Sequence, residues 1–134
     1  MVVLGIPPPL PNGVGRGLEN QCYDNARILC LAHPAWSYIE GVVCSSGGYP
    51  TAHAWCVDER GIVIDNTWPG DLPPPQDYVG VAFDIGAVLG VSARSNGCRG
   101  LLLNVSQRCP WLLDDTVAAL DPRWALARCE EPPC

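Results

Sequence analysis

Hydrophobic positions in the first third of the chain follow a helical spacing. In the segment NQCYDNARILCLAH, residues 20–33, apolar side chains recur at positions 22, 26, 29 and 30, with 23 beside them. Asn20 is a residue type that caps a helix at its amino end, and Pro34 is one that ends it. The pattern predicts a helix over residues 20–33 with Cys22 in its first turn.

Strand-like runs follow this helix. They are rich in aromatic and β-branched residues and are separated by glycine, proline and turn residues. The predicted strands are WSYIEGVVC (36–44), TAHAWCV (51–57), GIVIDNTW (61–68) and YVGVAFD (78–84).

The turn between the second and third of these runs sets their register. Asp58 and Gly61 occupy the first and last places of a type I turn, the pattern of a three-residue hairpin loop closed by a left-handed glycine. Trp55 then lies opposite Asp65, and His53 is a diagonal neighbour of Asp65 on the same face, about 7 to 8 Å away at the backbone. A two-residue loop would move Asp65 to the other face.

The two ends of the chain are less regular. Residues 1–17 are rich in proline and glycine and predict an irregular arm. In residues 85–134, GAVLGV and GLLLNV fit a strand or a buried helix, and DDTVAALDPRWALARC is helical around an interruption at Pro122. Because no repeat or linker divides the chain, we expect an arm over residues 1–17 and a single domain over residues 18–134.

The net charge of the chain limits the classes of partner that it is expected to bind. Fourteen acidic residues against eight arginines, with no lysine, give a formal net charge of -6. Such a surface repels a phosphate backbone, so we expect neither nucleic acid nor a membrane as partner. The amino terminus lacks a basic leader, and no stretch reaches the roughly 18 apolar residues of a spanning helix. We therefore expect a cytoplasmic protein.

Eight cysteines are many for a chain of 134 residues. In a reducing compartment they are expected to be thiols or catalytic residues rather than a disulfide framework. No C-x-x-C pair occurs, so we expect no metal and no cofactor. Late in the chain, pairing of Cys98 with Cys109 and of Cys129 with Cys134 stays open.

Cys22 is the cysteine best placed to act as a nucleophile. A helix amino terminus favours a thiolate, because unpaired N–H groups and the helix dipole direct positive charge at it. The same N–H groups, with the side chain of Asn20 or Gln21, would form an oxyanion hole for a tetrahedral intermediate. The alternative is that Cys22 is a small core residue.

A histidine base has only two candidates. His33 lies eleven residues after Cys22, about 16 Å along the helix, which is too far for a hydrogen bond. His53 remains. Asp65 would accept its N–H, fix its tautomer and leave the other ring nitrogen for Cys22. The alternative is a surface hairpin in which His53 and Asp65 merely pair.

The order Cys22, His53, Asp65, with HAW at 53–55 and DNTW at 65–68, resembles the transglutaminase-like branch of the papain-like cysteine enzymes. Further runs resemble its small, stand-alone bacterial or phage-borne members: QCYDNA at 21–26, YIEG at 38–41 and YVGVAF at 78–83. The resemblance covers roughly residues 20–83. It implies an α+β domain in which the Cys-bearing helix packs on a small antiparallel sheet, as in a papain-like core.

The resemblance also implies thiol-based acyl transfer. Cys22 would form the acyl-enzyme, His53 would activate it and protonate the leaving group, and Asp65 would orient His53. The domain over residues 18–134 would then be a cysteine-dependent hydrolase, a peptidase or amidase acting on a peptide or protein amide. The short spacing from His53 to Asp65 and the small chain disfavour a transglutaminase. An acyltransferase acting on an amine, and a catalytically inactive binding or inhibitory module, remain as alternatives.

Three further residues surround this constellation. Trp55 and Trp68 flank the catalytic candidates and would form walls of an acyl pocket, with aromatic core packing as the alternative. Glu40 could support the catalytic residues or contact a substrate amine, and an exposed carboxylate is the commoner alternative.

Overall fold

The computed structural model describes residues 1–45, 49–94, 100–103, 111 and 113–125. The elements in chain order are β1 (Val2–Leu4), α1 (Cys22–Ala32), β2 (Ser37–Ser45), β3 (Thr51–Val57), β4 (Val63–Ile64), β5 (Pro75–Phe83), α2 (Ile85–Arg94), α4 (Leu113–Ala118) and α5 (Pro122–Ala125). The fold is α+β, as predicted. No helix in the described residues is long and apolar enough to cross a membrane.

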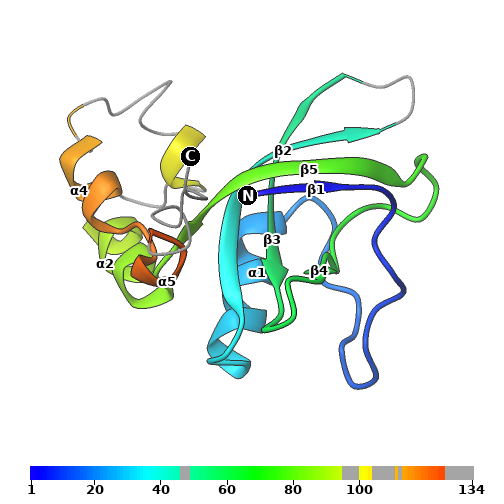
Figure 1. Cartoon of the computed structure of the whole chain (residues 1–134), viewed down its shortest axis with the longest axis horizontal. Coiled ribbons are helices and arrows are strands. Elements are labelled where there is room, and N and C mark those ends of the chain that lie inside the picture. Colours follow the sequence, from blue (N-terminus) through cyan, green and yellow to red (C-terminus); the bar gives the residue numbers. More distant parts are fainter. Residues whose placement is uncertain (46–48, 95–99, 104–110, 112, 126–134) are drawn as a thin grey trace, which may run out of the picture.

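The strands form one antiparallel sheet in the order β1-β5-β2-β3-β4. The long strands β2 and β5 make its centre, and Gly41 lies opposite Gly80 between them. A side chain at Gly80 would meet the ring of Trp55 at 2.7 Å, so this glycine leaves the space that the indole fills. Figure 1 shows β5 and β2 running side by side across the molecule.

The amino-terminal arm contributes a strand that the sequence did not predict. Val2–Leu4 pair with β5 through the register Val3↔Tyr78. The prediction of a wholly irregular arm over residues 1–17 is therefore wrong for these residues. Two β-branched valines precede the first proline, so this short segment can complete a backbone ladder at the edge of β5.

The helices gather on one face of the sheet. α1 packs against β2 and β3, and α2, α4 and α5 lie together at one end (Figure 1). The core between helices and sheet consists of Ala26, Cys30, Tyr38, Ala54, Cys56, Ile64, Phe83, Val88, Val91, Leu101 and Ala119. On the opposite face a second core consists of Ile39, Val43, Trp55, Val57, Val63, Tyr78 and Ala82. Alternation along β3 sends Cys56 to the first core and Trp55 to the second.

α1 begins later than its sequence pattern suggested. Its first residue is Cys22, Gln21 is the N-cap, and no side chain caps the first turn. Asn20, the predicted cap, has a φ of 60° and lies outside the helix. Its left-handed backbone differs from the extended backbone that an N-cap residue typically has. The helix ends at Ala32, two residues before Pro34.

The turn after β3 has the predicted form. The N–H of Gly61 donates to the carbonyl of Asp58 at 3.0 Å, and Gly61 has a φ of 82°. The pairs Cys56↔Ile64 and Val57↔Val63 have the register that a three-residue loop requires. The expected strand over residues 61–68 is shorter than predicted, because the carboxylate of Asp65 accepts backbone N–H groups that would otherwise extend the ladder.

Candidate active site

Cys22, His53 and Asp65 come together from three parts of the fold. Cys22 is the first residue of α1, His53 lies in β3, and Asp65 follows directly after β4. The Nε2 atom of His53 is 2.8 Å from Oδ2 of Asp65. The thiol of Cys22 lies near enough to the imidazole of His53 to raise the pKa of that ring. The structure thus brings the thiol, the imidazole and the carboxylate of the three predicted residues to one place.

Exposure decreases along this series. Cys22 is partly exposed, whereas the side chains of His53 and Asp65 are 6% and 2% exposed. Of the three residues Cys22 is the most exposed to solvent, while the imidazole and the carboxylate stay shielded from water. Low local dielectric strengthens the interactions between these buried groups.

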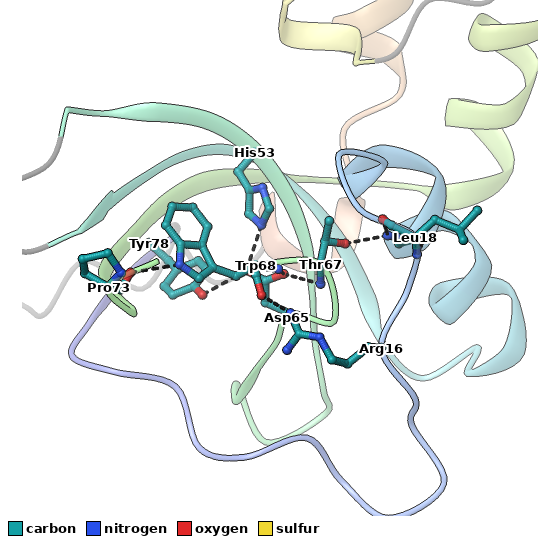
Figure 2. Close-up of polar contacts among 9 residues, drawn as sticks. Arg16, Leu18, His53, Asp65, Thr67, Trp68, Pro73 and Tyr78 are labelled. Carbon is teal, nitrogen blue, oxygen red and sulfur yellow. Dashed lines mark hydrogen bonds and ion pairs between the residues drawn. The ribbon is translucent and has the colours of Figure 1, made fainter. Parts of the chain in front are cut away.

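Asp65 accepts four hydrogen bonds. Its Oδ2 atom accepts from Nε2 of His53 and, at 3.1 Å, from the hydroxyl of Tyr78. Its Oδ1 atom accepts the backbone N–H groups of Thr67 at 3.0 Å and Trp68 at 3.3 Å. Figure 2 shows these donors arranged around the carboxylate. Because every donor is fixed by a strand or a tight turn, the carboxylate has one orientation toward His53.

These contacts move the pKa values of the buried groups. Burial lowers the pKa of His53, but its hydrogen bonds to Asp65 and Cys22 and their charges outweigh burial and raise it from 6.5 to about 9. Burial raises the pKa of Asp65, but the His53 hydrogen bond and charge, with the Thr67 N–H, bring it below its usual value. Burial and the charge of Asp65 raise the pKa of Tyr78, so its hydroxyl remains a donor.

The pairing also assigns the tautomer of the imidazole. An ionised carboxylate can only accept, so the Nε2 atom of His53 carries a proton and donates it to Asp65. Nδ1 is then the ring nitrogen left for Cys22. The contact between His53 and Asp65 is as predicted, and the role of Nδ1 toward Cys22 stays a prediction.

Asn25 connects the helix of Cys22 to the loop of Asp65. Its side-chain amide is buried and donates to Oγ1 of Thr67 at 2.8 Å and to the carbonyl of Leu18 at 2.8 Å. Its oxygen accepts the N–H of Leu18 at 3.2 Å. Sequence analysis missed this residue, although Asn25 is polar and lies beside the apolar positions of the helix, a signal that could have marked it.

The end of the arm is tied to the same loop. The N–H of Gly17 donates to the carbonyl of Asn66 at 2.8 Å, and the side chain of Asn66 donates to the carbonyl of Gly15 at 3.1 Å. Arg16 donates from its guanidinium to the carbonyl of Trp68 (Figure 2). Residues 15–18 therefore brace the loop that follows Asp65.

The two tryptophans have different places. Trp68 stands edge-on to the ring of His53, with centroids 5.6 Å apart, and its indole N–H donates to the carbonyl of Pro73 at 2.9 Å. Trp55 is 1% exposed and packs against Tyr78 in the second core. The prediction that Trp55 lines a substrate pocket is wrong, because its ring is enclosed by the sheet and cannot meet a ligand from solvent.

Asn20 and Gln21 are both exposed and lie immediately before Cys22. A pocket of about 290 Å³ at the start of α1 is lined by Glu19, Asn20, Gln21, Tyr23 and Asp24. Its lining is mainly polar and includes both chain neighbours of Cys22. The two predicted oxyanion residues thus line this pocket and directly precede Cys22 in the chain, whereas Cys22 itself does not line it. The uncapped first turn of α1 leaves backbone N–H groups available beside them.

Glu40 belongs to a separate polar cluster. It is 1% exposed and accepts the hydroxyl of Tyr38 at 2.8 Å and the N–H groups of Leu101 and Leu102, each at 3.0 Å. Burial raises its pKa. The expectation of an exposed carboxylate is wrong, because Glu40 satisfies the amino end of the helical turn at residues 101–103.

Within the described part of the chain, no group of three or more His, Cys, Asp or Glu side chains is arranged to hold a metal ion. The described cysteines, Cys22, Cys30, Cys44 and Cys56, are free thiols. The pairings considered for Cys98 with Cys109 and for Cys129 with Cys134 lie outside the described residues.

No protein-family model, curated protein or solved structure matches this chain. The functional argument therefore depends on the geometry of the site itself.

Proposed function

We propose that this chain is a cysteine-dependent hydrolase, a peptidase or amidase that acts through Cys22, His53 and Asp65. The single observation that supports it most is the buried His53, held between the partly exposed thiol of Cys22 and the fully hydrogen-bonded carboxylate of Asp65. A surface hairpin pair would not bury both groups or add a thiol. A helix-borne cysteine, a histidine on one strand and an aspartate after the next also fit the order of a papain-like, transglutaminase-like core.

The first half of the proposed reaction is acylation. The thiolate of Cys22 attacks the carbonyl carbon of a peptide or side-chain amide, and negative charge develops on the carbonyl oxygen. Backbone N–H groups at the start of α1, with the amide of Gln21 or Asn20, would stabilise that oxygen. Protonated His53 gives its proton to the leaving nitrogen, the C–N bond breaks, and a thioester remains on Cys22.

The second half is removal of the acyl group. His53, now neutral, takes a proton from water while the water oxygen attacks the thioester carbon. The C–S bond breaks, a carboxylic acid leaves, and Cys22 and His53 return to their starting states. Asp65 stabilises the imidazolium in both halves and keeps Nε2 protonated. If an amine replaces the water, the same site carries out acyl transfer, which is the second candidate function.

Site-resolved alkylation tests the activated pair. Trypsin cleaves this lysine-free chain only after arginines, so Cys22 lies alone in the peptide 17–27 and can be quantified apart from other thiols. At pH 6 iodoacetamide should label Cys22 at least about tenfold faster than Cys44, which is also partly exposed. His53→Ala should remove this advantage, and His33→Ala should keep it.

A different labelling result would contradict the proposed function. If Cys22 is labelled no faster than Cys44 from pH 5 to 8, the thiol is not activated. The binding-module alternative would then replace the enzyme.

A further inference from the structure

A second pair of side chains joins the two elements that carry Cys22 and His53. Cys30 lies in α1, about two helical turns after Cys22, and Cys56 lies in β3, three residues after His53. The two sulfur atoms are 2.9 Å apart. We propose that Cys30 and Cys56 form an intramolecular disulfide when the protein meets a small disulfide oxidant such as oxidised glutathione, and that the bond fastens α1 to β3.

The geometry requires little movement. A disulfide bond is about 2.05 Å long, so two sulfurs 2.9 Å apart must approach each other by about 0.9 Å. Both cysteines are buried in the core between α1 and the sheet, with exposures of 2% and 0%. Neighbouring side chains on both elements hold them there, so the pair is arranged by the fold rather than by chance encounter of mobile groups.

The reduced state already orders the two thiols. The S–H of Cys56 donates to the carbonyl of Ala26 at 3.1 Å, which leaves its sulfur to accept from the S–H of Cys30. Burial also raises the pKa of the Cys56 thiol. Because an oxidant cannot reach either sulfur in the closed core, oxidation takes place when α1 opens from β3, or before they dock during folding.

The chemistry is thiol–disulfide exchange and is balanced. The thiolate of one cysteine attacks a sulfur of oxidised glutathione, the glutathione S–S bond breaks, and a mixed disulfide and one glutathione thiol result. The second cysteine then attacks the protein sulfur of the mixed disulfide, forms the Cys30–Cys56 bond and releases the second glutathione. Two protein thiols lose two electrons and two protons, and one glutathione disulfide gains them.

The bond can be tested by refolding and peptide mapping. Cys44→Ala is refolded from urea with excess oxidised glutathione, and remaining thiols are blocked with N-ethylmaleimide in urea. Cleavage after Arg27, Glu40 and Arg60 places Cys30 and Cys56 in separate peptides, each with one cysteine in this variant. We expect these peptides to be linked, with a mass two hydrogens below their sum, and to separate on reduction.

Stability gives a second readout. The urea midpoint of Cys44→Ala should be higher after oxidation than before it, and the added substitution Cys30→Ala should abolish the difference. Reduction of the bond by glutathione should be complete in urea and incomplete in native buffer over the same time, because the sulfurs are buried. The activity of Cys22 is not a readout here, so this inference stands or fails independently of the proposed function.

Three results would overturn the inference. Recovery of Cys30 and Cys56 as blocked free thiols after oxidative refolding is one. Recovery of either residue linked only to glutathione is the second, and linkage of either to a different cysteine is the third.

Discussion

Replacing His53 with glutamine should remove a pH dependence of stability that the wild-type protein has. In the folded protein the pKa of His53 is raised from 6.5 to about 9, because hydrogen bonds and charges from Asp65 and Cys22 outweigh burial. The folded state therefore binds this proton more tightly than the unfolded state. The resulting stabilisation is complete below pH 6.5 and is lost as pH rises toward 9.

The size of the effect follows from the two pKa values. With 6.5 for the unfolded and about 9 for the folded state, the stabilisation is about 3 kcal/mol at pH 6 and about 1.4 kcal/mol at pH 8. The free energy of unfolding should thus fall by roughly 2 kcal/mol more in the wild type than in His53→Gln over this range. Ionisation of unfolded thiols near pH 8 does not disturb the comparison, because the wild type and His53→Gln contain the same cysteines.

Urea unfolding at pH 6, 7 and 8, with a reducing agent present, measures this difference. His33→Gln is the matched control, because it removes the other histidine, which stacks on Trp36 outside the site. It should keep the pH dependence of the wild type. If the curves of wild type and His53→Gln stay parallel from pH 6 to 8, the reasoning about a buried, protonated His53 is refuted.

Two further substitutions test the support of the site. Gly61→Ala should lower the free energy of unfolding in urea by about 1 kcal/mol, because Gly61 has a φ of 82° that alanine adopts only with strain. Gly70→Ala is the control and should be near neutral, because Gly70 lies at an open position without positive φ. Equal effects of the two substitutions would contradict the turn at Gly61. Tyr78→Phe should cost roughly 1 to 2 kcal/mol at pH 7, because Asp65 loses a donor, and the cost should vanish as pH falls through the lowered pKa of Asp65. Tyr49→Phe, at an exposed position, should cost nothing at either pH, and a pH-independent cost for Tyr78→Phe would argue against the hydrogen bond.

Local signals in the sequence predicted the parts of the site that depend on short-range geometry. Helical spacing placed Cys22 in the first turn of α1, and Asp58 with Gly61 fixed the hairpin register that brings His53 to Asp65. Both predictions use backbone rules that act over a few residues. They needed no knowledge of which strands are neighbours.

The remaining features depend on contacts between distant segments. Tyr78 reaches Asp65 from β5, and Asn25 reaches Thr67 from α1, through packing that no local pattern encodes. The position of Trp55 two residues after His53 predicts a place in the wall of the pocket. Alternation puts Trp55 on the same face of β3 as His53, and the space left at Gly80 lets its ring fill the second core on that face.

The strand order explains two other errors. β1 forms only because the edge of β5 is available to pair with it. Glu40 is buried only because the N–H groups of Leu101 and Leu102, at the start of the turn at residues 101–103, donate to its carboxylate. Each outcome depends on a partner far away in the chain. Propensity alone favours the opposite in both cases, a proline-rich arm and an exposed carboxylate.

Acylation by an activated ester tests most directly whether Cys22 is the nucleophile of an acyl-transfer enzyme. With p-nitrophenyl acetate as substrate, we predict a burst of nitrophenolate, and mass spectrometry should find an acetyl group on the peptide 17–27. Turnover to acetate should follow. If the enzyme is a hydrolase, acetate should remain the main product when methylamine is added as a competing acceptor. Cys22→Ala should lose the burst, and Cys44→Ala should retain it. Equal acylation of wild type and Cys22→Ala, or an acetyl group found only on other cysteines, would contradict the proposed function.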